Sequence, residues 1–418
     1  MQPVVAVPFA SKVHGEEYYL SIFDVLKRYF MKYGIEVHSS VITDDSEANN
    51  IGKRYSEFLP IAIVLTGGTS RLIDDFIDSA GFERLILFSH AEHNSLASAI
   101  SARNKAERKG VLNLAYHCSD INSPLCITTI DRMSRVARAV ASVIKLRVGV
   151  VVERDTKGEV EETLESRFRA EIILKSFDEL LEKVEKSNVK DVKEYIAGLL
   201  NIDSSTKYLE PIATLYLALK KFVQEERLDA ITIDCFPFIL KHGITPCIPL
   251  AILNSEGIVA GCEADLPSML GLFLAKSISG KSGWIANIVD VSANRCALAH
   301  CTIALDITKN VHVVSHFETG KPLSLVGELA GSTVTLLSID RDFTLAAIAL
   351  GKVLSSGGLG LNACRTQAIL EFDYPIETIV DMAPNNHHVI ILGDLRRELS
   401  ETLYLLGMDV VDYKELTV

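Results

Sequence analysis

Short apolar runs alternate with helix-patterned segments through the first two thirds of the chain, and this alternation is the strongest constraint on its fold. The runs Val4–Pro8, Ile61–Leu65 and Arg84–Phe88 are apolar along almost their whole length, whereas Glu17–Tyr33 has apolar residues at helical spacing. A strand that is apolar on both sides is buried on both faces, which is typical of a parallel sheet covered by helices. A new strand at Arg147–Val152 starts a second unit of the same kind.

The pattern changes after about Gly280, where short β-rich runs separated by turn residues replace the helix-patterned segments. Such runs are typical of an antiparallel barrel or sandwich. Single hydrophobic cores stop growing at roughly 250–300 residues, so a chain of 418 residues is expected to form several domains. We predict an α/β protein in which two Rossmann-like parallel-sheet domains, residues 1–130 and 131–282, precede a C-terminal antiparallel β-barrel-like domain, residues 283–418.

The composition limits which partners the protein can bind and in which cellular compartment it is expected. The formal net charge is −12, and an acidic surface repels phosphate backbones, so we expect no nucleic-acid partner. No apolar run approaches the roughly 18–20 residues that span a bilayer, and the start MQPVVAVPFA lacks the basic region and long apolar core of a signal peptide. The eight cysteines include no C-x-x-C pair and are expected to be reduced, mostly buried thiols. These features predict a cytoplasmic protein without a membrane partner.

A polar segment follows the third predicted strand of the first domain. It reads His90-Ala-Glu-His93-Asn94-Ser95, and open α/β sheets bind ligands at the carboxyl ends of their parallel strands. Its two imidazoles and its amide are therefore candidates for hydrogen bonds to a polyol. As an alternative, Asn94 or Ser95 is a plain N-cap for the next helix.

Two carboxylates, Glu263 and Asp265, precede the predicted helix Leu266–Ile278. Asp265 is in position to cap that helix, and this structural role is as well supported as a catalytic one. Glu263 lies between Cys262 and Ala264 in an apolar run, where an unpaired charge is costly. A metal ion or a charged partner would remove that cost, so Glu263 is the stronger candidate for a functional carboxylate.

The segments Thr232–Thr302 and Asn385–Asp394 resemble the L-fucose isomerase and L-arabinose isomerase superfamily, and the resemblance extends more loosely over most of the chain. In that family a metal-ligating glutamate stands just before a helix, as Glu263 does here. The second ligand of the family lies on the following strand, at the position that Asn287 occupies. The third is a histidine close to the C-terminus, which His387 matches.

The resemblance implies an aldose–ketose isomerase that uses a divalent metal, with Mn²⁺ expected and Mg²⁺ or Co²⁺ as alternatives. Glu263, helped by Asp265, would move a proton between adjacent carbons through an enediol. The arabinose branch adds a further histidine, for which His300 is the candidate. As alternatives, His300 is a hydrogen-bonded core residue, or it forms a zinc site with Cys296 and Cys301. The residues expected to contact the sugar are His90, His93, Asn94 and His300.

Asn287 departs from the family pattern, in which an acid occupies the second ligand position. An amide can offer its oxygen to a metal but cannot take up a proton as a carboxylate does. Two functions therefore stay open: an isomerase in which Asp265 or Asp290 supplies the second acid, or a non-catalytic sugar-binding or regulatory homologue. The resemblance also implies a homotrimer or homohexamer with sites near the subunit interfaces.

Overall fold

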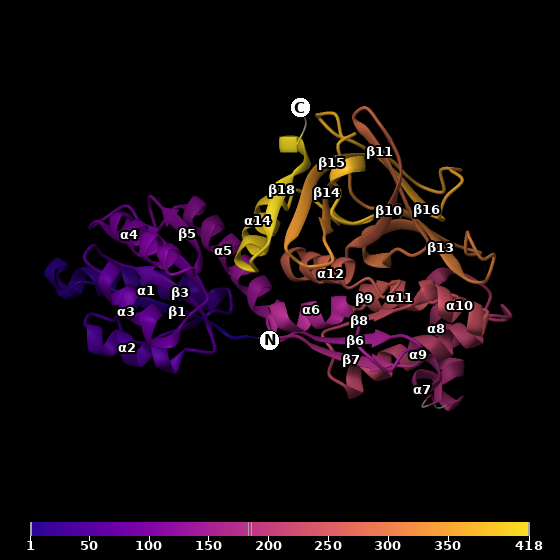
Figure 1. Cartoon of the computed structure of the whole chain (residues 1–418), viewed down its shortest axis with the longest axis horizontal. Helices are drawn as coiled ribbons and strands as arrows, with labels where there is room; N and C mark the ends of the chain where they lie inside the picture. The colour runs from indigo at the N-terminus through magenta and orange to yellow at the C-terminus, as the bar shows by residue number, and fades with distance from the viewer. Residues whose placement is uncertain (1, 183, 185, 417–418) are drawn as a thin grey trace. The chain divides into compact units, whose positions relative to one another are not determined.

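The computed structural model of the chain describes residues 2–182, 184 and 186–416 (Figure 1). The chain divides into two compact units: Met1–Ile144 with Glu398–Gly407, and Lys145–Arg397 with Met408–Val418. The expected division into three domains, with boundaries after residues 130 and 282, stays a prediction. None of the helices within the described residues combines the length and the apolar composition that crossing a membrane requires.

The first unit is built on a parallel sheet with the strand order β2-β1-β3-β4-β5. Every residue of its central strand β3 is buried, as the continuously apolar sequence predicts. The strands are β1 (Val4–Phe9), β2 (Glu36–Val37), β3 (Leu59–Val64), β4 (Arg84–His90) and β5 (Leu112–Cys118). The helices are η1 (Lys12–His14), α1 (Glu16–Lys32), α2 (Asp45–Arg54), α3 (Ser70–Ala80), α4 (Ser95–Arg108) and α5 (Pro124–Val143).

Helix α3 shows how the sequence forms the layer that covers this sheet. The helix ends at Gly81, whose φ of +65° is the left-handed conformation that glycine adopts without a Cβ clash. Within the core the ring of Phe76 meets Phe9 of β1 edge to face, with centroids 5.4 Å apart. Truncating such a buried ring costs about 3–5 kcal/mol. The buried face of α3 consists of Leu72, Ile73, Phe76 and Ile77.

Cys118 and Cys126 form a disulfide, so the expectation of reduced thiols is wrong for this pair. Cys118 ends β5, and α5 begins shortly afterwards because the Ser123 hydroxyl caps it by accepting from the Cys126 backbone N–H. This early helix start brings the two Cα atoms to 5.2 Å, within the range that a disulfide spans. The other cysteines are free thiols, as expected.

The second unit begins with a parallel sheet of order β7-β6-β8-β9. Its register pairs Ile233 with Cys262, so the ends of β8 and β9 lie side by side. The strands are β6 (Arg147–Val151), β7 (Glu171–Lys175), β8 (Ala230–Ile233) and β9 (Val259–Cys262). The helices are α6 (Glu159–Phe168), α7 (Phe177–Glu182), α8 (Lys186–Leu200), α9 (Leu209–Glu225), α10 (Cys235–His242), α11 (Cys247–Ser255) and α12 (Leu266–Ser279).

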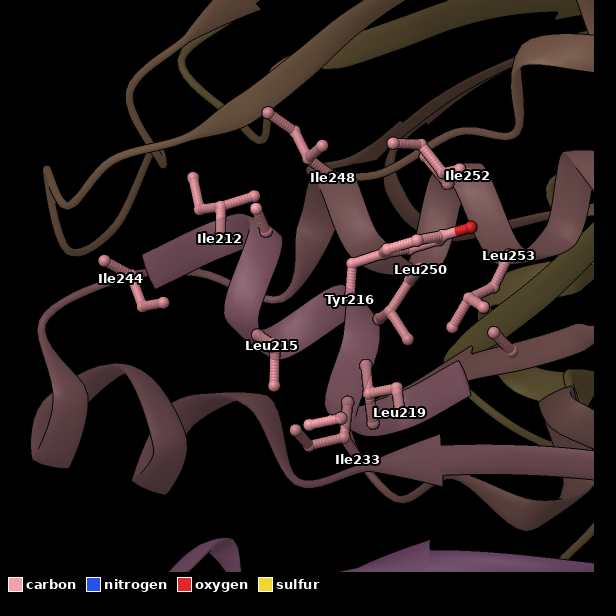
Figure 2. Close-up of a cluster of buried hydrophobic side chains, with 14 of the residues drawn as sticks. Ile212, Leu215, Tyr216, Leu219, Ile233, Ile244, Ile248, Leu250, Ile252 and Leu253 are labelled. Carbon is pink, nitrogen blue, oxygen red and sulfur yellow. The ribbon is translucent and has the colours of Figure 1, made fainter. Parts of the chain in front are cut away.

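Helices α9 and α11 pack with β8 into an apolar core, part of which Figure 2 shows. Each fully buried aliphatic side chain of this kind contributes about 1.5–3 kcal/mol relative to an exposed one. The hydroxyl of Tyr216 donates to Oε1 of Glu256 across 2.6 Å, so the ring is buried while its polar end is bonded. This core anchors β8, whose end leads toward the candidate site. The other labelled members are Ile212, Leu215, Leu219, Ile233, Ile244, Ile248, Leu250, Ile252 and Leu253.

The rest of the second unit contains a closed antiparallel barrel with the strand order β14-β17-β10-β11-β16-β15, in which β15 pairs again with β14. The predicted fold class, parallel α/β sheets followed by an antiparallel β-barrel, is therefore confirmed. The strands are β10 (Trp284–Ser292), β11 (Arg295–His300), β12 (Thr308–Val314), β13 (Ser324–Leu329), β14 (Thr333–Ile339), β15 (Leu345–Gly357), β16 (Thr366–Glu371), β17 (His387–Leu392) and β18 (Asp409–Asp412). The helices are η2 (Leu305–Ile307), α13 (Ile379–Met382), α14 (Arg396–Leu405), most of which belongs to the first unit, and η3 (Tyr413–Leu416).

Helix α12 joins the two layers of the second unit. It packs against β8 and β9 and against β14 and β17, and Figure 1 shows it between β9 and β14. Gly271 permits the close approach to β17, because a Cβ at this position would lie 2.7 Å from Cγ2 of Val389. This packing positions β17, which begins at His387, relative to the helix that follows Glu263.

Candidate functional site

Three neighbouring barrel strands bring together residues that are far apart in the sequence. Strand β10 pairs with β11 on one side and with β17 on the other. In these registers Asn287 lies opposite Ala299 of β11 and opposite His387 of β17. His300 follows Ala299 and is the last residue of β11. The three sequence-predicted residues on these strands therefore occupy adjacent positions in the barrel.

The turn between β9 and α12 brings Glu263 to these strands. Strand β9 ends at Cys262, and the next two residues, Glu263 and Ala264, have φ values of +60° and +50°. The left-handed conformation costs a non-glycine residue roughly 1–2 kcal/mol, and strain of this kind clusters at functional sites. The backbone N–H of Ala264 donates to the carbonyl of Ile233 across 3.0 Å, which ties the turn to β8.

The carboxylate of Glu263 lies between two imidazoles. Its Oε1 is 3.4 Å from Nε2 of His300, and its Oε2 is 3.7 Å from Nε2 of His387. The other ring nitrogen of His387, Nδ1, donates to Oδ2 of Asp265 across 2.7 Å. An ionised carboxylate only accepts hydrogen bonds, so a neutral His387 carries its proton on Nδ1 and directs the Nε2 lone pair toward Glu263.

Asp265 has a structural role as well. Its side chain caps α12 by accepting from the backbone N–H of Ser268 at 3.2 Å and from the Ser268 hydroxyl at 2.6 Å. The N-cap that the sequence indicated is therefore present. The same carboxylate orients the ring of His387, an arrangement that commonly lies behind metal-ligating histidines. A direct catalytic role for Asp265 stays a prediction.

Charges within this group shift the pKa values of its members. Burial acts to raise the pKa of the Glu263 carboxyl, but His300 and His387 outweigh burial and hold that pKa below its usual value. Burial is likewise outweighed at Asp265, whose pKa is lowered by its bonds to His387 and Ser268. For His387 the carboxylates outweigh burial and raise the pKa. The group therefore contains two ionised carboxylates at neutral pH.

Two cavities meet at Glu263. The larger, about 480 Å³, is also lined by Asp265 and His387 and has a volume typical of small-molecule sites. The smaller, about 180 Å³, is also lined by Asn287 and His300. Other residues of the larger cavity include Arg154, Glu161, Arg341, Asn385 and Asn386.

Buried nitrogens of the site have no hydrogen-bond partner. Among residues 2–182, 184 and 186–416 this is true of both ring nitrogens of His300 and of Nε2 of His387, although these side chains are only 3% and 4% exposed. Buried polar atoms are almost always bonded, and a carboxylate with two imidazoles is a ligand set for a divalent metal. Asn287 accepts from Nδ2 of Asn386 across 2.9 Å and retains a second lone pair on Oδ1. The residues present therefore fit a divalent ion.

The remaining sequence candidates, His90, His93 and Asn94, lie in the first unit. His90 is buried, and its Nε2 bonds the carbonyl oxygen of Leu65 at 2.9 Å. The ring of His93 stacks on Tyr18 with centroids 3.6 Å apart. Asn94 occupies the N-cap position of α4 with a φ of +59°. Contact of these three side chains with a sugar stays a prediction.

The sequence interpretation missed the cysteines that line the smaller cavity. Cys235 follows β8 and Cys262 ends β9, and the carboxyl ends of adjacent parallel strands are a general signal for a site. No local signal marked Cys247 or Cys364 as part of a site, because Cys247 begins α11 and Cys364 precedes β16, and only the tertiary structure brings both to one cavity. The cavity residues that the sequence interpretation missed are Cys235, Phe236, Cys247, His316, Glu318 and Cys364. Cys262 was named only as a neighbour of Glu263, and Cys301 only as an alternative zinc ligand.

No family model matches this chain. The chain is 23% identical over 182 residues to a protein named sulfoquinovose isomerase from Priestia aryabhattai, covering 41% of each chain. It is 25% identical over 180 residues to one from Alkalicoccus urumqiensis, covering 40% of each. A third, from Clostridium sp. (strain MSTE9), is 23% identical over 241 residues, covering 54% of this chain and 53% of the relative. The chain thus spans from two fifths to about half of the length of the curated relatives it matches, and over that span it is similar to proteins named sulfoquinovose isomerase.

Proposed function

We propose that this protein is a sugar isomerase that interconverts an aldose and a ketose by moving a proton between adjacent carbons. Similarity to proteins named sulfoquinovose isomerase supports the proposal. The observation that carries it is the position of Glu263, whose carboxylate is held by a strained turn between two buried histidines. That carboxylate also borders a cavity of a size suited to a small ligand.

Glu263 would act as the proton carrier. Its lowered pKa keeps the carboxylate ionised near neutral pH, so it can accept a proton from the carbon beside a carbonyl. The amides of Asn385 and Asn386 line the same cavity and would bond the hydroxyls of the sugar. Glu318 lines the smaller cavity with Glu263 and would serve as a second carboxylate, in place of the acid that is missing at Asn287.

A divalent ion would be held by Glu263, Asn287 and His387, with His300 as a further ligand; Mn²⁺ is the expected ion and Mg²⁺ or Co²⁺ are alternatives. When bound, such an ion would polarise the carbonyl and hydroxyl oxygens of the sugar. Asp265 would hold the ring of His387 in place through its 2.7 Å hydrogen bond and so assist Glu263 indirectly.

Sulfoquinovose is the first substrate to test, because it is named in the relatives. The superfamily resemblance also suggests a homotrimer or homohexamer, and we keep the cytoplasmic location, which the sequence predicts, as part of the proposal. In such an assembly His90, His93 and Asn94 would contact the sugar held by a neighbouring subunit.

Exchange of substrate protons with solvent tests the proposal. The protein, supplied with Mn²⁺ in D₂O, is incubated with sulfoquinovose and, in parallel, with pentoses, hexoses and their phosphates. We expect NMR to show deuterium at the carbon beside the carbonyl of at least one sugar, together with the appearance of its isomer. Saturable binding of a sugar without exchange or conversion of any of them would instead favour a non-catalytic sugar-binding protein.

A further inference from the structure

Several cysteines line the smaller cavity at Glu263. These cysteines share the cavity with carboxylates and imidazoles, including those of Glu263, His300 and His316. A purely structural buried thiol is normally surrounded by apolar side chains, whereas a mixture of thiols, imidazoles and carboxylates is the composition of a metal centre. The cysteines that line the cavity are Cys235, Cys247, Cys262, Cys301 and Cys364.

Cys262, Glu263 and His300 are arranged as ligands of one ion. The sulfur, one carboxylate oxygen and one ring nitrogen of these residues all lie within 4.8 Å of one another. Oε1 of Glu263 and Nε2 of His300 are 3.4 Å apart. Two ligand atoms that are each about 2.0–2.1 Å from a tetrahedral ion stand roughly 3.4 Å from each other. This pair therefore already has the spacing of one edge of a tetrahedral site.

The strained turn after β9 makes this convergence possible. Consecutive residues of a regular strand point to opposite faces, so Cys262 and Glu263 would normally face apart. The φ of +60° at Glu263 breaks that alternation, and both side chains line the same cavity. The turn therefore places a thiol beside the carboxylate of the proposed site.

The unbonded nitrogens of His300 are a second indication of a ligand at this position. The His300 side chain is 3% exposed, and within the described part of the chain neither of its ring nitrogens has a hydrogen-bond partner. Its Nε2 has only the 3.4 Å contact with Oε1 of Glu263 among the ion pairs of the described residues, and a buried imidazole without a hydrogen bond is unusual. An ion between His300 and Cys262 would satisfy Nε2 and would neutralise the nearby carboxylate.

We infer that the Cys262 thiolate is a ligand of the ion at this site, and that the site therefore prefers a thiophilic ion of the zinc class to Mn²⁺. The sulfur–metal bond forms as the thiol S–H bond breaks, and its proton passes to the buffer, so each bound ion releases one proton from Cys262. Soft thiolate ligands favour zinc-class ions, whereas Mn²⁺ and Mg²⁺ favour oxygen ligands. The inference rests on the proposed function for the roles of Glu263 and His300, adds the sulfur ligand, and replaces Mn²⁺ by a zinc-class ion as the expected metal.

Substitution with Co²⁺ tests the sulfur ligand directly. The full-length protein is freed of metal with a chelator and titrated with CoCl₂. We expect a thiolate-to-cobalt charge-transfer band in the near ultraviolet and the intense visible bands of a tetrahedral site. Cys262→Ser should remove the charge-transfer band and lower Zn²⁺ affinity, measured by chelator competition, by at least about 10-fold. Cys296→Ser is the matched control. Cys296 is a buried free thiol that packs in the barrel core, and the ligand group found among the described residues is Cys262, Glu263 and His300, not the zinc set with Cys296 that the sequence left open. This variant should leave both properties unchanged.

An undiminished charge-transfer band in Cys262→Ser would overturn the inference. If that variant does not fold, zinc-edge X-ray absorption of the unmodified protein decides: a sulfur neighbour at about 2.3 Å supports the inference, and its absence overturns it. Deuterium exchange measured on the same samples separates this inference from the proposed function. Exchange without a sulfur ligand refutes the inference alone, whereas a sulfur ligand without exchange on any sugar refutes the isomerase alone.

Discussion

His387 and Asp265, which are 122 positions apart in the chain, are joined by a 2.7 Å hydrogen bond from Nδ1 to Oδ2. Asp265 is fixed in turn by its capping bonds at the start of α12, and His387 is the first residue of β17. Asp265 at the start of α12 and the backbone at the start of β17 thus hold the imidazole of His387 in a single orientation. Its second nitrogen is left facing Glu263 at 3.7 Å, so the geometry of the candidate site depends on this contact.

Asp265→Asn should weaken binding of Mn²⁺ or Co²⁺ by about 10- to 100-fold, the usual effect of changing the partner of a metal-ligating histidine. The fold should be retained, because asparagine also caps helices well. Competition titrations measure the affinity. Asp44→Asn is the matched control, since Asp44 caps α2 by accepting from the Glu47 backbone N–H at 2.9 Å. An equal loss of affinity in both variants would show that Asp265 does not act by positioning His387.

Glu263→Gln should slow deuterium exchange into the substrate by about 10²- to 10⁴-fold, because glutamine has the size of glutamate but cannot take up the proton. Exchange is followed by NMR under saturating sugar. Glu210→Gln, at an exposed position in the first turn of α9, should exchange at the unmodified rate. Full activity of Glu263→Gln would assign proton transfer to another group, and Glu318→Gln would then be the next variant to measure.

Asn287→Asp should raise the affinity for Mn²⁺ on the order of 10-fold, because a carboxylate adds charge to the oxygen donors of the site. The Nδ2 donor of Asn386, now 2.9 Å from Oδ1 of Asn287, would remain available to the new carboxylate. Without metal the same substitution should lower the melting temperature, since it adds a charge to a cavity that already contains Glu263. Melting curves with and without Mn²⁺ test both effects, and weaker metal binding by the variant would contradict the expectation.

Gly271→Ala should destabilise the second unit by about 1–3 kcal/mol, the usual cost of overpacking a core. The new Cβ would lie 2.7 Å from Cγ2 of Val389 and would push β17 away from α12. Because β17 begins at His387, metal affinity should fall together with stability. Gly198→Ala is the control. This glycine lies in α8, and among the described residues no atom outside its own stretch of helix lies within 4 Å of the place its new methyl group would take. The change should therefore be neutral or stabilising by up to about 1 kcal/mol. Denaturant unfolding distinguishes the two substitutions.

The buried His90 should make the first unit less stable in mild acid. Burial is the main cause that lowers the pKa of His90, so the unfolded chain takes up a proton at a higher pH than the folded chain. The stability that neutral His90 contributes is therefore complete above about pH 6.5 and is lost as the pH falls toward its lower folded-state pKa. His90→Gln should flatten the fall in melting temperature over this range, whereas His312→Gln, at an exposed position of β12, should not. Equal slopes for His90→Gln and the unmodified protein would contradict this account.

Much of the layer structure was predictable, because it depends on neighbours within a few residues. The apolar run of β3 and the spaced apolar residues of α3 have the periods of a two-sided buried strand and of an amphipathic helix. The cap at Asp265 followed from its place before Leu266-Pro267, where a helix can start without an internal donor. The disulfide between Cys118 and Cys126 was not predictable in this way, since it depends on how soon α5 begins after β5.

The sequence by itself determined which segments become strands and helices, and it marked Glu263 as a charge in apolar surroundings that needs a partner. Only the tertiary structure decided which partners it has. His300 and His387 face Glu263 because β10 pairs with β11 and β17 in particular registers. Cys262 joins them because a non-glycine residue adopts a left-handed turn. Strand pairing and register connect residues that are far apart in the chain. The barrel as a whole selects one register through the burial of its faces, and a local sequence pattern does not encode that choice.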